Sequence, residues 1–201
     1  MIKDIFSNCL NEVKSKSLRP LGSLKSKFKK IGIVGSGLMG HGIAYVSSYY
    51  GFKVVLIDNS KENVLTAFSK IEKMFKTEIK QNLFSNSQME KCLENIKVST
   101  DVSDLKGCDL VIEAVYEDTA LKRDVTIAAE KIMKSSGVFS SNTSTIPISK
   151  LATVSVRPEN FIGIHFFSPV HKMKLVEIIK NDNTSSNTLA RTLDFINAIK
   201  K

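Results

Sequence analysis

The sequence has 201 residues, of which 42% are hydrophobic and 24% are charged, and its formal net charge is +9. A chain of this length can bury one good hydrophobic core, with little left for a second full domain. Apolar runs stay well below the roughly 18 residues that a membrane-spanning helix needs, so we expect no membrane span.

The positive charge is concentrated at the start of the chain. Residues 1–30 carry eight Lys and Arg side chains against two acids, a net charge of +6, and the remaining 171 residues carry only +3. The lead segment has few aromatic side chains that stack on bases, and it matches no nucleic-acid motif. We therefore expect a solvated segment and no nucleic-acid partner.

The cysteines and the first residues bear on the compartment. Cys9, Cys92 and Cys108 are odd in number and lack C-x-x-C spacing, which fits reduced thiols better than a disulfide or a metal site. The segment MIKDIFSNCLNEVKSK has no apolar stretch of the kind found in a secretory signal. We expect a cytoplasmic protein, or one of an organelle matrix if the source is eukaryotic, with no catalytic metal.

Residues 1–29 form a lead-in of their own. Residues 1–17 fit one amphipathic helix, with its apolar face made by Ile2, Ile5, Phe6, Cys9, Leu10 and Val13. Pro20, Gly22 and a serine- and lysine-rich stretch then indicate a linker. We assign residues 30–201 to a single folded domain.

The domain begins with a glycine-rich turn between a strand and a helix. A short β-branched strand, Lys30–Val34, leads into Gly35-Ser36-Gly37-Leu38-Met39-Gly40, and a helix should follow to about Tyr50. In a G-x-G-x-x-G motif the first glycine permits the tight turn, the second lets the backbone approach a pyrophosphate, and the third allows close packing of helix on strand. The N-terminus of the helix offers N–H groups to the same pyrophosphate. The motif predicts dinucleotide binding.

Asp58 indicates which dinucleotide is bound. It ends the next predicted strand, Val54–Ile57, where a carboxylate can bind a ribose diol and repels a 2′-phosphate. We therefore expect NAD and not NADP. Lys61 lies nearby and could bind a 2′-phosphate, but we interpret it as a solvated lysine.

The following segments alternate between helices and strands. Ser60 is a candidate N-cap for a helix to about Lys80, and Ser87 with Glu90 is a candidate capping box for a second helix that ends near Asn95. The further predicted segments are strands at Ile96–Ser99, Asp109–Val115 and Gly137–Ser141 and a helix at Thr119–Lys134. This pattern is typical of an α/β, doubly wound (Rossmann) and mostly parallel sheet, here with an inserted helix pair.

Two ionisable side chains lie within the apolar strands of the C-terminal third. Phe161–Phe167 contains His165, and Leu175–Lys180 contains Glu177. The connection between them is too short for a parallel crossover, so we expect an antiparallel C-terminal strand, followed by a helix from Thr184. A His–Glu pair either joins two strands structurally or makes a proton acceptor of the imidazole, and the residues alone leave both open.

A polar segment and two further histidines complete the candidates. Ser141–Thr145 follows a strand, where its hydroxyls and the Asn142 amide either orient a substrate or cap the next helix. We expect His41 to be exposed, and His171 to lie at an entrance without a partner.

Four motifs together carry a family resemblance. GSGLMGHGIA, DLVIEAVYED, FSSNTST and GIHFFSPVHKMKLVEII, in this order and spacing, resemble the NAD-binding domain of the 3-hydroxyacyl-CoA dehydrogenase family. That family oxidises (S)-3-hydroxyacyl-CoA to 3-oxoacyl-CoA with NAD in fatty-acid β-oxidation. The resemblance implies that His165 is the catalytic base, that Glu177 orients it, that Ser144 binds near the 3-oxygen of the substrate and that Asn142 helps to hold the reacting groups. It also implies that the cofactor contacts include Ala114, Val115, Glu117, Lys122, Asn142 and Ser144.

The resemblance further implies missing parts. The segment FSNCLNEVKSKSLRP is similar to the linker that follows an enoyl-CoA hydratase domain in multifunctional members. The helical C-terminal domain of the family, which closes over the acyl-CoA and dimerises, is not in this sequence. We therefore expect NAD binding with incomplete catalysis by these residues alone and an oligomeric full-length enzyme. A non-catalytic NAD-binding module, structural or sensory, is the alternative.

One position departs from the pattern of the family. Ser168 stands in HFFSP where the family commonly has Asn.

Overall fold

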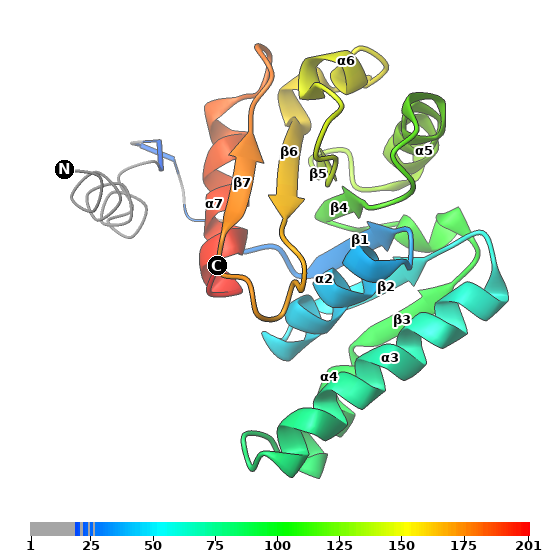
Figure 1. Ribbon diagram of the computed structural model, residues 1–201. Helices are drawn as coiled ribbons and strands as arrows, with labels where there is room; N and C mark the ends of the chain where they lie inside the picture. Colours follow the sequence, from blue (N-terminus) through cyan, green and yellow to red (C-terminus); the bar gives the residue numbers. More distant parts are fainter. Residues whose placement is uncertain (1–18, 21, 24, 26) are drawn as a thin grey trace.

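The computed structural model describes residues 19–20, 22–23, 25 and 27–201 (Figure 1). The predicted lead-in helix at residues 1–17 lies outside these residues. The described residues form one seven-stranded sheet in the order β3-β2-β1-β4-β5-β6-β7. Its strands are β1 Lys30–Val34, β2 Lys53–Ile57, β3 Ile96–Ser99, β4 Leu110–Glu113, β5 Val138–Ser141, β6 Phe161–Phe166 and β7 Val176–Ile179.

Six strands run parallel, and only β7 is antiparallel to its neighbour, β6. The chain therefore has the predicted doubly wound fold with an antiparallel C-terminal strand. Residues on one strand alternate between two apolar layers, because successive side chains of a strand point to opposite faces. In β2, Val54 and Leu56 face one layer and Val55 and Ile57 the other.

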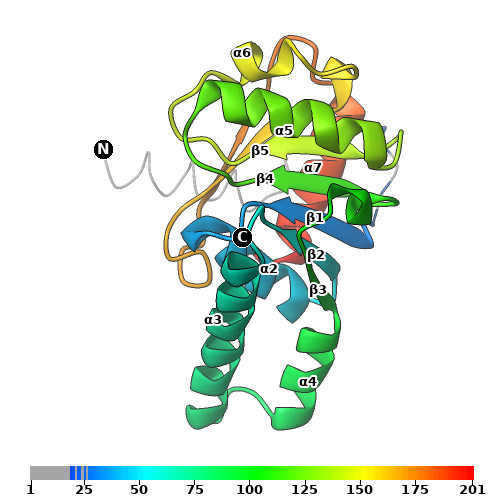
Figure 2. The same ribbon diagram turned by 90° about the vertical axis from the view of Figure 1, so that its right-hand side faces the viewer.

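Helices cover both faces of the sheet. Against one face pack α2 Leu38–Tyr49, α3 Lys61–Lys80 and α7 Ser186–Ala198, and against the other pack α5 Thr119–Ile132 and α6 Ile148–Ala152. Figure 2 shows α5 and α6 above the sheet and the pair of α3 and α4 (Asn86–Glu94) extending below it. Two short 3-10 helices, η1 Val102–Leu105 and η2 Pro158–Asn160, complete the elements.

The inserted helix pair is confirmed, with one correction to its second N-terminus. The Ser60 hydroxyl caps α3 by accepting the N–H of Asn63, as predicted. The capping box of α4 is Ser85 with Gln88, two residues before the predicted Ser87 and Glu90. Both pairs fit the same spacing, and Cys92 is the buried residue of this helix.

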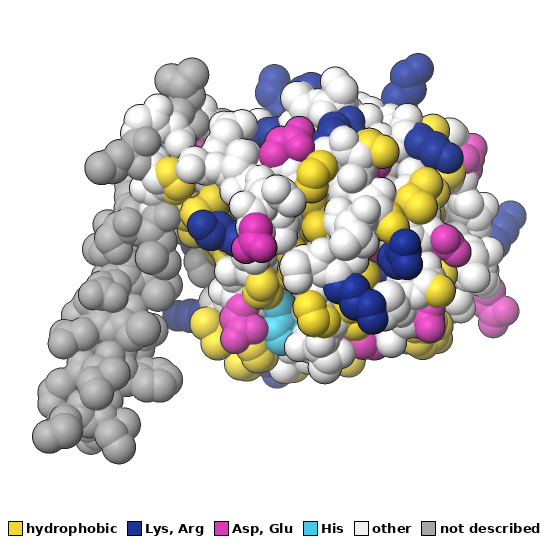
Figure 3. Space-filling model, turned by 90° about the horizontal axis from the view of Figure 1, so that it is seen from above, with side chains coloured by type: hydrophobic (Ala, Val, Ile, Leu, Met, Phe, Trp, Pro, Cys, Tyr) yellow, Lys and Arg dark blue, Asp and Glu magenta, His cyan; other side chains and the backbone are white. Residues whose placement is uncertain are grey.

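Among the described residues, the surface has no long apolar helix, and the face beside α5 and α6 shows no basic stripe. In the described part of the chain, no helix has both the length and the apolar character to cross a membrane. Figure 3 shows lysine and arginine side chains mixed with aspartate and glutamate side chains on that face. Cys92 and Cys108 are buried free thiols.

Candidate active site

The topology brings the predicted site residues to one edge of the sheet. The glycine turn follows β1, Asp58 follows β2, Ala114 follows β4 and Asn142 follows β5. These strands are parallel, so their carboxyl ends meet at one edge, which is where ligands of open α/β sheets bind. The end of β6 and the start of the antiparallel β7 add His165 and Glu177 at the same edge.

The glycine turn has the geometry that the motif predicts. Gly35 has a φ of +100°, and a Cβ there would lie 2.5 Å from the carbonyl oxygen of Ala114. A Cβ on Gly40 would lie 1.8 Å from the carbonyl oxygen of Gly35, so helix α2 approaches the turn too closely for any side chain. On Gly37 a Cβ would meet no described atom within 4 Å. The open side of Gly37 thus leaves room for a ligand.

Helix α2 begins directly at this open side. Gly37 is its N-cap, and no described side chain caps its first N–H groups. Leu38 is 66% exposed, and Met39 is partly buried against the core. Uncapped N–H groups and the positive end of the helix dipole are what a pyrophosphate needs, so these residues fit the phosphates of a dinucleotide.

Asp58 is held in place at the tip of β2. Its Oδ2 accepts hydrogen bonds from the Ser36 N–H at 2.9 Å and the Ser36 hydroxyl at 2.8 Å, and its Oδ1 accepts from the Asn63 amide at 3.0 Å. Partial burial acts to raise the pKa of Asp58, but the hydrogen bonds from Ser36 and Asn63 outweigh it and keep the pKa below its usual value. The carboxylate is therefore fixed and charged where a ribose diol would bind. Lys61 is exposed.

His165 and Glu177 form the predicted pair. They face one another in the β6–β7 register, and His165 Nδ1 lies 2.9 Å from Glu177 Oε2. The side chain of His165 is 17% exposed and that of Glu177 is 53% exposed. The ring of Phe167 lies 4.6 Å from the imidazole. Nε2 of His165 has no hydrogen-bond partner within the described residues, so it is free to accept a proton from a ligand.

Asn142 and Ser144 lie in the loop after β5. The side-chain oxygen of Asn142 accepts the backbone N–H of Phe166 at 2.9 Å, which ties this loop to the residue beside His165. Ser144 is exposed, and its backbone N–H donates to Glu117 Oε1 at 3.1 Å. The structure thus joins the predicted polar loop to the strand that carries the histidine.

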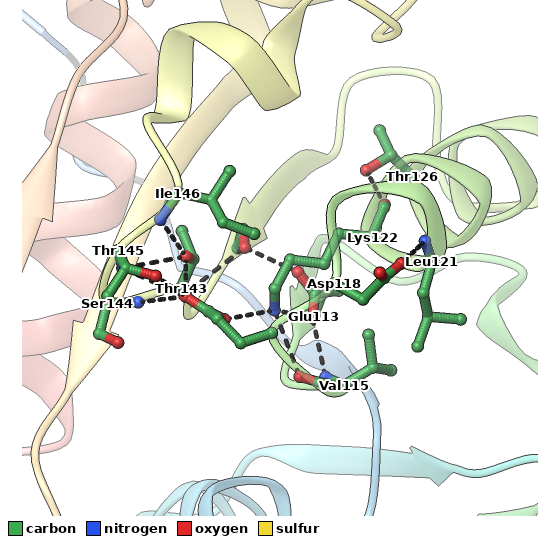
Figure 4. A network of polar contacts seen from close by, with 12 residues as sticks. Glu113, Val115, Asp118, Leu121, Lys122, Thr126, Thr143, Ser144, Thr145 and Ile146 are labelled. Carbon is green, nitrogen blue, oxygen red and sulfur yellow. Dashed lines mark hydrogen bonds and ion pairs between the residues drawn. The ribbon is translucent and has the colours of Figure 1, made fainter.

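A charged network, buried at Glu113 and Lys122, lies behind this loop (Figure 4). Lys122 Nζ lies 2.8 Å from Glu113 Oε1, 3.2 Å from Glu117 Oε2 and 3.2 Å from the carbonyl oxygen of Val115. Glu117 Oε1 accepts hydrogen bonds from Thr143 and Thr145 as well as from Ser144. Burial acts to raise the pKa of Glu117, but these bonds and Lys122 lower it to about 2.

Sequence reasoning did not assign a role to Glu113. It lies within the predicted strand Asp109–Val115 and is fully buried. The signal was available, since a buried carboxylate requires a partner and Lys122 follows in the first turns of the next helix. The contacts of Glu117 and Lys122 with the cofactor stay predictions.

The remaining histidines differ from expectation. The prediction of an exposed His41 is wrong, because its side chain is buried and its Nδ1 lies 2.7 Å from the carbonyl oxygen of Gly37. Desolvation lowers the pKa of His41. His171 is exposed, and its ring packs edge-on against Tyr45 beside a cavity of about 370 Å³. None of the residues predicted for the catalytic or cofactor site lines that cavity.

Comparison with known proteins agrees with this geometry. The family model for the 3-hydroxyacyl-CoA dehydrogenase, NAD binding domain, matches residues 30–201. The chain belongs to this family. NAD is accordingly the cofactor of the domain, and oxidoreductase chemistry in fatty acid oxidation is the context of its family.

Relatives of the chain are larger proteins. The alpha subunit of the fatty acid oxidation complex of Vibrio vulnificus (strain CMCP6) is 40% identical over 166 residues, which are 82% of this chain and 24% of that protein. The crystal structure of (S)-3-hydroxybutyryl-CoA dehydrogenase from Ralstonia eutropha has a TM-score of 0.85 and 36% identity, over 87% of this chain and 62% of that one. The dehydrogenase part of multifunctional enzyme 1 from C. elegans has a TM-score of 0.80 and 31% identity, over 90% and 41%. The chain thus spans about a quarter of the curated relative that it matches.

Proposed function

We propose that this domain serves the NAD-dependent oxidation of (S)-3-hydroxyacyl-CoA to 3-oxoacyl-CoA, with His165 as the general base. The observation that carries the proposal is the 2.9 Å contact between His165 Nδ1 and Glu177 Oε2, at the sheet edge that also holds the glycine turn. The names of the Vibrio and Ralstonia relatives support fatty acid oxidation and a 3-hydroxyacyl thioester as substrate.

Each residue of the site has its own role in the proposed reaction. NAD, when bound, would supply the two-electron acceptor for the hydride of C3 of the substrate. His165 Nε2 takes the proton of the 3-hydroxyl group, and the C3–O bond becomes a carbonyl. Glu177 holds Nδ1–H, which fixes the tautomer and stabilises the imidazolium that forms. Ser144 donates a hydrogen bond to the 3-oxygen, and Asn142 holds the loop against β6.

The cofactor is held by the segments around the glycine turn. The open side of Gly37 and the start of α2 take the pyrophosphate, and Asp58 takes the adenosine ribose. Turns after β4 and β5 complete the proposed contacts, which are Ala114, Val115, Glu117, Lys122, Asn142 and Ser144. Asp58 is charged and already held by Ser36, so a 2′-phosphate would meet a fixed negative charge.

We propose that catalysis requires parts beyond these residues. The chain covers 24% of its Vibrio relative, which supports a longer protein with a helical C-terminal domain and an N-terminal hydratase domain. Residues 1–29 would then link the hydratase domain to the NAD-binding domain. We expect the complete protein to be oligomeric, in the cytoplasm or in an organelle matrix, and this chain alone to bind NAD with little turnover.

The test is substrate-dependent reduction of NAD by a full-length version that carries the flanking domains. We expect absorbance of NADH to appear with (S)-3-hydroxybutyryl-CoA, and neither with the (R) isomer nor with free 3-hydroxybutyrate. Tight NADH binding without turnover of any 3-hydroxyacyl-CoA would contradict the proposal and favour the non-catalytic module.

A second test concerns the role of Glu177. Glu177→Gln keeps the size of the side chain and removes the charge that stabilises the imidazolium. We expect kcat to fall by about 10- to 1,000-fold with NADH affinity retained, since general base catalysis contributes about 10²–10⁴. Unchanged kcat would show that the pair only joins two strands.

A further inference from the structure

A buried carboxylate, Glu113, lies at the end of β4 without a place in the proposed chemistry. Its relative exposure is 0%, and the other residues of β4 are the apolar Leu110, Val111 and Ile112. Burial of a charged carboxylate is costly unless hydrogen bonds and an opposite charge compensate it. An apolar residue at this position would build the same strand, so the carboxylate serves something beyond the sheet.

The partners of Glu113 are Lys122 in α5 and three residues in or directly before the two loops of the site. Oε1 accepts the backbone N–H of Val115 at 2.8 Å and lies 2.8 Å from Lys122 Nζ. Oε2 accepts the Ser141 hydroxyl at 2.7 Å, and the backbone carbonyl accepts the N–H of Asn142 at 2.8 Å. One residue therefore fixes the start of the loop after β4 and the start of the loop after β5.

Lys122 connects Glu113 to Glu117, because its ammonium group contacts both carboxylates. Its side chain is 2% exposed, and its three N–H donors face three oxygens, those of Glu113, Glu117 and the Val115 carbonyl. Lys122 also lies in the first turns of α5, where the helix dipole disfavours a positive charge. A lysine so placed holds two carboxylates together.

Glu117 accepts hydrogen bonds from several donors of the loop after β5. Its Oε1 accepts the backbone N–H groups of Ser144 and Thr145, both at 3.1 Å, and the Thr145 hydroxyl at 3.0 Å. It also accepts the Thr143 hydroxyl (Figure 4). The orientation of Glu117 therefore sets the conformation of the segment that presents Ser144.

We propose that Glu113 is a positioning residue, which acts through Lys122 and Glu117 to hold the Asn142–Thr145 loop in the conformation that catalysis needs. Replacing a buried ion pair by apolar residues is often neutral or stabilising, so stability alone does not require the buried pair of Glu113 and Lys122. Precise placement of a loop does, because a displacement of about 1 Å in a reacting group can cost about 100-fold in rate.

The chain offers a matched control in Glu130. This residue is also a buried glutamate, at 5% exposure, and lies further along α5, the helix that carries Lys122. It accepts the Ser155 hydroxyl at 2.6 Å and the backbone N–H of Val156 at 2.9 Å, away from the sheet edge. Glu130→Gln therefore removes a comparable buried charge without touching the loop.

The first test is amide hydrogen exchange of this chain, read residue by residue by NMR. In Glu113→Gln we expect the N–H groups of Ser144 and Thr145 to exchange at least about tenfold faster, because their acceptor Glu117 loses its fixed partner. In Glu130→Gln both rates should stay within about threefold. Unchanged exchange in Glu113→Gln overturns the proposal. If that variant does not fold, Ser141→Ala removes the bond to Oε2 together with the acceptor of the Thr143 N–H, and unchanged exchange of Ser144 and Thr145 there overturns the proposal equally.

The second test is kinetic and rests on the proposed function, unlike the first. In the full-length protein we expect Glu113→Gln to lower kcat for acetoacetyl-CoA by about 10- to 100-fold. ADP-ribose, which probes only the glycine turn and Asp58, should bind within about threefold of the unsubstituted protein, and Glu130→Gln should keep its kcat. A kcat that falls equally in both variants would mean a purely structural role. If the unsubstituted protein is inactive, only the proposed function is refuted. The hydrogen-exchange result still decides whether Glu113 positions the loop.

Discussion

Gly37 and Gly40 lie three residues apart, and the structure gives them different roles. A Cβ on Gly40 would lie 1.8 Å from the carbonyl oxygen of Gly35, so Gly40→Ala must move backbone. Overpacking of this kind typically costs about 1–3 kcal/mol or more. A Cβ on Gly37 meets no described atom within 4 Å, and its φ of −61° suits alanine. Replacing a glycine N-cap by alanine costs only about 0.5–1 kcal/mol.

The fold tolerates the methyl group that Gly37→Ala introduces, but this group should weaken the binding of NADH. Gly37→Ala puts this group on the side where the pyrophosphate meets the N–H groups of α2. Loss of one hydrogen bond to a charged group costs about 1.5–3 kcal/mol. The NADH dissociation constant should therefore rise about 10- to 100-fold.

Calorimetry with NADH and thermal unfolding of this chain separate the two effects. We expect Gly37→Ala to lower Tm by about 1–4 °C and to lose most of its NADH affinity, whereas Gly40→Ala should lose much more stability. Gly37→Ala with unchanged NADH affinity would refute the assignment of the pyrophosphate to this turn. A large loss of stability in Gly37→Ala would refute the reasoning about its open side.

Three further predictions concern titratable groups. Asp58→Ser removes the fixed negative charge at the tip of β2, and the ratio of NADPH to NADH affinity should rise at least about tenfold in calorimetry. Hydrogen bonds lower the pKa of Glu117 from 4.5 to about 2, so its charge stabilises the fold above about pH 4.5 and this contribution is lost as the pH falls towards 2. In urea unfolding, the stability difference between the unsubstituted chain and Glu117→Gln should therefore shrink over that range, and a constant difference would contradict it. Burial raises the pKa of the Cys108 thiol to about 11. In a Cys9→Ser background, Cys92 and Cys108 should therefore resist alkylation at pH 8 until denaturant is added. Rapid alkylation of the native chain would contradict their burial.

The strands and the His–Glu pair could be predicted because their signals are local. A strand that is buried on both faces is a continuous apolar run, and an acid or a histidine inside such a run stands out. The short connection between β6 and β7 fixed their antiparallel direction, and the period of a strand then allowed His165 to face Glu177. The glycine motif likewise specifies backbone geometry with little dependence on distant residues.

The errors concern features that depend on distant residues. Two overlapping Ser-x-x-Glu/Gln pairs fit the start of α4, and the local pattern does not distinguish Ser85 from Ser87. His41 lies in the first turns of α2, and its burial depends on elements that pack there from elsewhere in the chain.

The most direct test of the account is turnover of acetoacetyl-CoA with NADH by the full-length protein carrying His165→Gln, measured beside its NADH affinity. We predict a dissociation constant for NADH within about twofold of the unsubstituted protein and a kcat lower by about 10²–10⁴, the contribution of a general base. A kcat retained within about threefold would contradict the account, because the proton acceptor would then lie elsewhere than at the β6–β7 edge.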